Sequence, residues 1–128
     1  MFNTFLVMAG GAIGAALRYQ LGRASLRLIG PGYPWGTLAA NVIGGFVMGL
    51  AAGWLAMRYQ GGQGEQIRLF VAVGVLGGFT TFSAFSLETM VMIERGEVLG
   101  AIGYVLLSVL GSVGALALGL ALIRGATA

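Results

Sequence analysis

Four long stretches without a charged residue divide this sequence, and they constrain its fold more than any other feature. They run from Met1 to Leu17, from Leu28 to Met57, from Leu69 to Leu87 and from Val98 to Ile123. A helix needs about 20 apolar residues, within a range of roughly 17–25, to cross the hydrocarbon core of a bilayer. The chain is therefore expected to cross a membrane four times.

Two of the stretches need their ends adjusted. The first is short, and Arg18 and Tyr19 can extend it because long side chains reach to the membrane surface. The second contains Pro31 and Pro34, so its helix is expected to begin near Trp35. We predict an all-α integral membrane fold with a polar turn at 59–65. It would form one domain over residues 1–128, with helices at about 2–27, 35–58, 67–94 and 98–124.

Composition excludes several classes of protein. Only 9% of the residues are charged and 58% are hydrophobic, whereas soluble domains carry roughly 25% charged residues. An N-terminal signal peptide is disfavoured, since no basic region precedes the first apolar run and no small-residue cleavage site follows it. The absence of cysteine and histidine removes thiolate metal sites and the commonest general base. An enzyme and a nucleic-acid partner are not expected.

The arginines are divided evenly between the two sides of the membrane once the N-terminal amine is counted. Consecutive connections alternate sides, which places Arg58, Arg68 and Arg124 with that amine on one side and Arg18, Arg23, Arg27 and Arg95 on the other. The Lys/Arg difference normally sets orientation. Equal numbers predict that copies insert both ways up and pair as an antiparallel homodimer. The alternative is that another signal resolves the orientation.

Glycine is abundant, with 24 residues, and many glycines lie four apart, as in Gly10 and Gly14 or Gly45 and Gly49. Small residues at this spacing allow transmembrane helices to approach closely. Four helices barely enclose a pathway. A pathway between subunits, or along the face of one subunit, is therefore more plausible than a central channel in a monomer.

The third stretch carries a predicted helix break near the middle of the membrane. Gly77 and Gly78 are followed by Thr80 and Thr81, which is poor helix-forming sequence. Irregular backbone is tolerated at that depth only where it is buried in protein or lines a polar cavity. Freed carbonyls at such a break can coordinate a cation. A simple kink satisfied by threonine hydroxyls is the alternative.

Two phenylalanines follow the break and share one face of the helix. Phe82 and Phe85 are three residues apart. Because the edges of aromatic rings are positive, a pair of ring edges can contact an anion. Ordinary packing into lipid or against a neighbouring helix is the competing interpretation.

Polar side chains form a line on the fourth predicted helix. Tyr104, Ser108 and Ser112 are spaced four apart, so their hydroxyls follow one face, and Thr37 and Asn41 have the same spacing on the second helix. Hydroxyl and amide donors can replace part of the water shell of an anion. Interhelical hydrogen bonding explains the same pattern without a pathway.

Two charged residues lie at membrane depth. Glu88 follows Phe85 by one turn, and it is expected to be a vestibule or proton-handling group or to reach outward to the surface. Arg18 is expected to offset the partial negative charge at the carbonyl ends of helices or to attract anions electrostatically.

Three segments together resemble the Fluc (CrcB) family of fluoride channels. They are 77–85 (GGFTTFSAF), 10–18 (GGAIGAALR) and 36–44 (GTLAANVIG), and they lie in order on the three expected helices. The resemblance covers essentially the whole chain. It implies a dual-topology antiparallel homodimer in the cell membrane, with two pores that conduct fluoride passively and protect the cell.

The resemblance also implies roles for individual residues. Phe82 and Phe85 match the phenylalanine pair that flanks the fluoride path. The polar residues that match the family's pathway are Asn41, Thr81, Ser83, Tyr104, Ser108 and Ser112, with Thr37 added from its spacing. Carbonyls of Gly77 and Thr80 from both subunits would bind a central structural sodium ion. Ala84 departs from the family pattern, which usually has threonine there, so no hydroxyl role is expected at position 84.

Two other classes share this outline. Small multidrug transporters are also four-helix proteins, but they need an acid in the first helix, and residues 1–17 contain none. A structural or assembly subunit without transport activity is opposed only by the aligned hydroxyls and the broken third helix.

Overall fold

The computed structural model describes residues 1–58 and 64–127, and these residues form helices and no strand. The predicted turn at 59–65 falls largely outside the described residues. The elements are α1 (Phe2–Leu28), α2 (Trp35–Arg58), α3 (Glu65–Ile67), the π-helix η1 (Arg68–Leu76), α4 (Gly77–Phe79), α5 (Ser83–Glu94) and α6 (Val98–Thr127). The all-α prediction is confirmed.

Three helical segments are long and apolar enough to cross a membrane. They are Trp35–Arg58, Glu65–Glu94 and Val98–Gly125. Helix α1 has 27 residues but is not one of the three, since its apolar run is short and Arg18, Arg23 and Arg27 occupy its second half. Length and hydropathy thus support three of the four predicted crossings.

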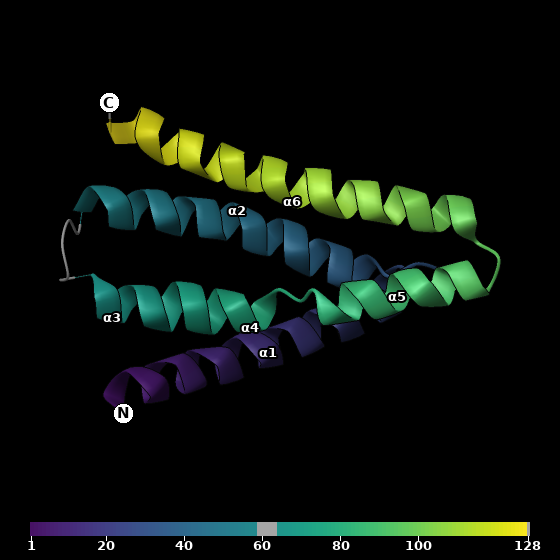
Figure 1. Cartoon of the computed structure of the whole chain (residues 1–128), viewed down its shortest axis with the longest axis horizontal. Coiled ribbons are helices and arrows are strands. Elements are labelled where there is room, and N and C mark those ends of the chain that lie inside the picture. The colour runs from purple at the N-terminus through teal and green to yellow at the C-terminus, as the bar shows by residue number, and fades with distance from the viewer. Residues whose placement is uncertain (59–63, 128) are drawn as a thin grey trace.

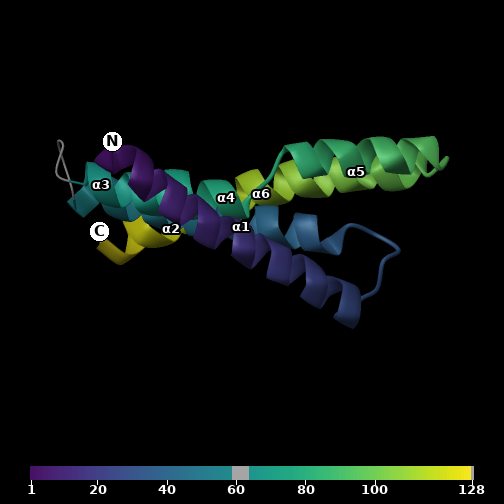
Figure 2. The same cartoon turned by 90° about the horizontal axis from the view of Figure 1, so that it is seen from below.

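The helices lie roughly side by side, with α6, α2, the α3–α5 segment and α1 in that order from top to bottom in Figure 1. Both ends of the chain lie at one end of the bundle. The connections at 29–34 and 95–97 lie at the opposite end, where α1 and α2 diverge from α5 and α6 (Figure 2).

Helix α1 packs on η1 and α4 through glycines. A β-carbon on Gly10 would meet the backbone of Phe70 and Gly74, and one on Gly14 would meet the backbone of Val75 and Phe79. Only a residue without a side chain fits at either position. The two helices are therefore in backbone contact, as the four-residue glycine spacing predicted.

Helices α2 and α6 pack in the same way. A β-carbon on Gly45 would lie 2.6 Å from the carbonyl oxygen of Ser112, and one on Gly49 would collide with the carbonyl of Leu116. From the other side, Gly119 of α6 contacts the backbone of α2 at Phe46 and Leu50. This interface brings the polar line of α6 against the face of α2 that carries Asn41.

The third segment is irregular in two places. After the short α3 it continues as η1, a π-helix of nine residues, which the sequence did not predict. Helical geometry then ends after Phe79, because Thr80 is extended (φ −85°, ψ 159°), and it resumes at Ser83. The predicted break is thus present, and Figure 1 shows it as the thin connection between α4 and α5.

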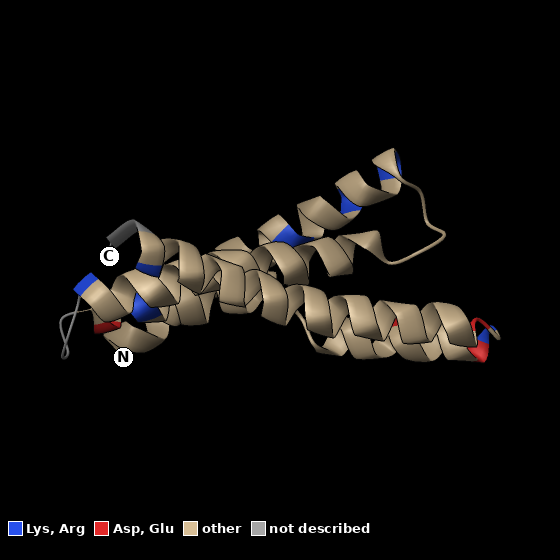
Figure 3. Ribbon diagram, turned by 90° about the horizontal axis from the view of Figure 1, so that it is seen from above, with Lys and Arg blue, Asp and Glu red and all other residues tan. Residues whose placement is uncertain are grey.

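Charged residues gather at the two ends of the bundle and on the diverging part of α1 (Figure 3). Arg58 ends α2, Arg68 begins η1 and Arg124 lies in the last turn of α6, all toward the end of the bundle that carries the termini, and Arg68 forms a 2.7 Å ion pair with Glu65. Glu94, together with Arg95 and Glu97 of the adjoining connection, lies at the opposite end.

Candidate functional site

Asn41 holds the broken backbone through a pair of hydrogen bonds. Its Nδ2 donates to the carbonyl of Thr81 at 3.1 Å, and its Oδ1 accepts from the Thr81 amide at 2.9 Å. The side-chain amide thereby satisfies both backbone polar groups of one residue, as a neighbouring peptide group would. Because unsatisfied backbone groups are expensive at membrane depth, this pairing explains how the break is tolerated.

The same contacts release two carbonyls from helical hydrogen bonding. In a continuous helix the amides of Thr81 and Ala84 would bond to the carbonyls of Gly77 and Thr80, four residues earlier. Here the Thr81 amide bonds to Asn41, and the Ala84 amide bonds to the Thr81 hydroxyl at 3.2 Å. The carbonyls of Gly77 and Thr80 therefore lose their helical partners.

Neighbouring groups fix the rest of the break. The Thr80 hydroxyl donates back to the carbonyl of Leu76 at 2.9 Å. Arg18 of α1 donates its Nε to the carbonyl of Gly78 at 3.4 Å. The arginine thus sits at the carbonyl end of α4, which is one of the two roles expected for it.

A cavity of about 410 Å³ lies between α2, the break and α6. We call it the central cavity. It collects six of the predicted pathway residues, namely Asn41, Thr81, Phe82, Phe85, Ser108 and Ser112. The rest of its lining is Gly44, Gly45, Met48, Thr80, Val109, Val113 and Leu116. None of the described residues that line it is charged, so their polar groups are neutral hydroxyl, amide and backbone groups.

The two phenylalanines have different surroundings. Their ring centroids lie 5.6 Å apart at an interplanar angle of 45°. Phe85 packs on Tyr104 with centroids 5.2 Å apart, whereas Phe82 is 77% exposed. Most of the Phe82 ring, at the end of the break, is therefore left uncovered by the rest of the described chain.

The hydroxyl line of α6 contains buried donors. Tyr104 is 0% exposed and Ser108 is 5% exposed, while Ser112 is half-buried. In the described part of the chain, neither the Tyr104 hydroxyl nor the Ser108 hydroxyl makes a hydrogen bond of regular geometry. Leaving a buried hydroxyl unpaired costs about 1–3 kcal/mol. Such groups are therefore available to bind a ligand.

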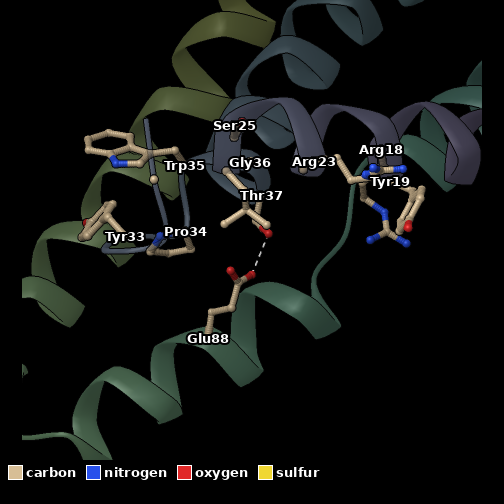
Figure 4. Close-up of a pocket in the computed structure, with 13 residues that line it drawn as sticks. Arg18, Tyr19, Arg23, Ser25, Tyr33, Pro34, Trp35, Gly36, Thr37 and Glu88 are labelled. Atoms are coloured by element: carbon tan, nitrogen blue, oxygen red, sulfur yellow. Dashed lines mark hydrogen bonds between the residues drawn. The ribbon is translucent and has the colours of Figure 1, made fainter. Parts of the chain in front are cut away.

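A second cavity, of about 330 Å³, opens where α1 and α2 diverge from α5. We call it the outer pocket. Thr37 donates to the Glu88 carboxylate across it at 2.6 Å (Figure 4). Arg18 and Arg23 also line it, so the pocket carries two cations and one anion, in contrast to the central cavity.

Aromatic rings cluster beside the outer pocket, and two of them, Tyr33 and Trp35, belong to its lining. Tyr33 packs edge-on against Tyr104, with ring centroids 5.7 Å apart, and at a tilt against Trp35, with centroids 4.8 Å apart. Its hydroxyl donates to the carbonyl of Gly100 at 3.3 Å. Burial raises the pKa of this phenol above its usual value.

Some expected residues lie apart from the central cavity. Ser83 is exposed and its hydroxyl lies 3.5 Å from that of Thr81, outside the cavity lining. Thr37 belongs to the outer pocket.

Gly44 lines the cavity but was not singled out from the sequence. Its position three residues after Asn41, on the same helix face, was the available signal.

Membrane-length helices, a broken segment clamped by a side-chain amide and a neutral cavity define a small multi-pass helical membrane protein. The family model described as "CrcB-like protein, Camphor Resistance (CrcB)" matches residues 5–120. The chain belongs to this family.

Relatives cover nearly the whole chain. A protein of Mesorhizobium japonicum named "Fluoride-specific ion channel FluC" is 56% identical over 97% of this chain and 98% of its own length. Proteins with the same name from Novosphingobium aromaticivorans and Phenylobacterium zucineum are 50% and 58% identical, over 98% and 93% of both chains.

Proposed function

We propose that this protein is a fluoride-selective channel that exports fluoride passively and so protects the cell from its toxicity. The relatives that cover almost its whole length carry that specificity in their names. The observation that carries the proposal is the central cavity, where neutral donors converge and the buried Ser108 hydroxyl has no protein partner within the described residues.

The chemistry of the lining suits a small, strongly hydrated anion. A channel must bind its ion firmly enough to replace water and weakly enough to release it. Hydroxyl and amide donors in series meet both demands, and the ring edges of Phe82 and Phe85 add weak positive contacts. A cation in the cavity would hold the ion more tightly, and Arg18 and Arg23 instead line the outer pocket.

The channel is proposed to cross the cell membrane four times. The fourth crossing is supported by the backbone contact of α1 with η1 and α4, since η1 and α4 belong to a membrane-length segment. Trp35 and Trp54 stand 19 residues apart on α2, or about 28 Å at 1.5 Å per residue. That distance matches the hydrocarbon thickness of about 30 Å, with the tryptophans at its two surfaces.

Two oppositely oriented copies would complete the pathway. The equal number of positive charges on the two sides, with the N-terminal amine counted beside the arginines, supports this dual-topology homodimer, and so does the 77% exposure of Phe82 beside the cavity. Contact with a second copy would cover that ring. The second copy would also close the side of the cavity that a single chain leaves open.

A structural sodium ion at the dimer interface is part of the proposal. Its ligands would be the carbonyls of Gly77 and Thr80 from both copies. The donor set fits, because both carbonyls have lost their helical partners to Asn41 and Thr81. Neutral oxygens suit a hard monovalent cation. Bound by carbonyls of both copies, the cation would hold the two broken segments together.

Glu88 and Arg18 are assigned to the entrance of the pathway. Both line the outer pocket, and Glu88 is held there by Thr37. Arg18 would raise the local concentration of anions, and the Glu88 carboxylate would limit how tightly they are held. Tyr104 packs on Tyr33, which lines this pocket, and on Phe85, which lines the central cavity, so its hydroxyl would receive the ion between the two.

Fluoride efflux from liposomes tests the proposal directly. Purified protein is reconstituted in vesicles loaded with potassium fluoride, and efflux is followed with a fluoride electrode after a potassium ionophore is added. We expect protein-dependent efflux that chloride-loaded vesicles do not match. Phe82→Ile or Asn41→Asp should abolish it while the dimer persists, whereas Phe5→Ile, on the exposed outer face of α1, should not.

The outcomes separate the alternative classes. No efflux from the unmodified protein would reject the channel. Proton movement driven by a cationic drug would favour a multidrug transporter, and neither activity would favour a structural subunit. Unchanged efflux in both Phe82→Ile and Asn41→Asp would remove these residues from the pathway.

A further inference from the structure

Gly44 and Thr80 meet where α2 crosses the break. A β-carbon built on Gly44 would collide with the Cγ2 methyl of Thr80 and would lie 3.4 Å from the Phe79 ring. Gly44 is itself buried. The glycine therefore provides the space that the threonine methyl occupies.

The Thr80 side chain is held from two directions. Its hydroxyl donates to the carbonyl of Leu76 at 2.9 Å, while its methyl occupies the space that a side chain at position 44 would need. Both groups branch from one Cβ, so rotation about χ1 moves them together, and branched side chains have few alternative rotamers. A side chain at position 44 would displace the methyl. The hydroxyl would then lose Leu76, or the backbone of Thr80 would turn.

We propose that Gly44 is a positioning residue that fixes the direction of the Thr80 carbonyl. Gly44 lies one turn after Asn41, so one face of α2 contacts two successive residues of the break, Thr80 and Thr81. Asn41 binds the Thr81 backbone, and Gly44 seats the Thr80 side chain. The link from this carbonyl to a sodium ion rests on the proposed function. The contact between Gly44 and Thr80 does not.

A rescue experiment tests this assignment. Thr80→Ser removes the methyl and keeps the hydroxyl, so it relieves the collision that Gly44→Ala creates. We expect Gly44→Ala to lower fluoride efflux about tenfold and to raise the sodium concentration needed to keep the dimer together. The Gly44→Ala/Thr80→Ser double variant should recover most of both losses relative to Thr80→Ser alone, because the two residues are in direct contact.

Gly45→Ala is the matched control. Its added methyl would meet the Ser112 carbonyl on α6, which Thr80→Ser does not relieve. The proposal is supported if adding Thr80→Ser restores efflux and dimer stability to Gly44→Ala but not to Gly45→Ala. It is overturned if Gly44→Ala is harmless, if the double variant is as impaired as Gly44→Ala, or if Thr80→Ser rescues both glycine variants equally.

Thermal unfolding of the same variants keeps the two proposals separable. If the unmodified protein moves no fluoride, the proposed function fails, but the melting temperatures still report whether Thr80→Ser relieves Gly44→Ala. If Gly44→Ala does not fold, recovery of folded dimer in the double variant supports the assignment. Failure to recover folded dimer overturns it.

Discussion

Two kinds of helix contact occur in this molecule, and they differ in what they can tolerate. The glycine interfaces, α1 with η1 and α2 with α6, bring backbone against backbone. Between α2 and the broken segment, the Asn41–Thr81 pair and the Thr37–Glu88 bond are polar contacts, and they flank the packing of Gly44 on the Thr80 methyl. We call this second region the polar gap.

The difference separates stability from transport. The glycine interfaces have no spare volume, so any added atom there must move a helix. The polar gap is bordered by the central cavity and the outer pocket, with volumes of about 410 and 330 Å³. Changes in the gap should therefore alter binding and flux while the bundle stays assembled.

Breaking a glycine interface should have the largest effect. In Gly14→Ala the new methyl would meet the backbone of Val75 and Phe79, which cannot move without shifting η1. We expect a loss of about 3 kcal/mol in unfolding free energy, at the upper end for overpacking. The measurement is thermal or denaturant unfolding in detergent.

Gly11→Ala provides the control on the same helix. An added β-carbon there has nothing within 4 Å, and alanine favours a helix over glycine by about 1 kcal/mol. Its stability should be equal or higher. Equal destabilisation by Gly11→Ala and Gly14→Ala would show that backbone contact does not distinguish the two positions.

Removing the buried serine hydroxyl should reduce transport without reducing stability. The Ser108 hydroxyl has no partner within the described residues, so Ser108→Ala removes an unsatisfied group and should leave the melting temperature equal or higher. Efflux should fall about tenfold, which corresponds to about 1.4 kcal/mol. Ser86→Ala on α5, outside the central cavity, should leave efflux unchanged. A loss of stability with normal efflux in Ser108→Ala would mean that the hydroxyl is structural.

The sequence predicted the helices, the break and the line of hydroxyls better than it predicted the contacts between them. Uncharged stretches and the Pro31–Pro34 pair located the helices, since burial in lipid demands long apolar runs. Glycine and threonine pairs located the break, because both residue types weaken helices. The spacing of Tyr104, Ser108 and Ser112 placed them on one face.

Long-range features were not predictable from one sequence. The Asn41–Thr81 pairing joins residues 40 positions apart, and spacing along one helix carries no information about its partner. The π-helix depends on which carbonyl each amide selects, and no residue type in Arg68–Leu76 specifies that choice. The spacing of Gly44 from Asn41 places both on one face of α2, but it does not predict that Thr80 packs against this glycine.

A change in the polar gap at the outer pocket should have a moderate effect. Thr37→Val keeps the shape of the side chain but leaves the Glu88 carboxylate without its 2.6 Å donor. We expect a loss of about 1 kcal/mol in stability and a fall in efflux of roughly threefold. Thr4→Val, on exposed α1 surface, is the control. Unchanged efflux and stability in Thr37→Val would mean that the hydrogen bond matters to neither.

The smallest effect is expected outside both regions, at the ion pair between Arg68 and Glu65. Both side chains are about half exposed, at 48% and 50%, and such pairs contribute little because water and salt screen them. Arg68→Gln should leave both the melting temperature and the efflux unchanged, and so should the double variant with Glu65→Gln. A clear loss in Arg68→Gln that the double variant repairs would show that this pair orders the start of η1. The glycine interface with α1 would then depend on an anchor at the membrane surface as well as on backbone contact.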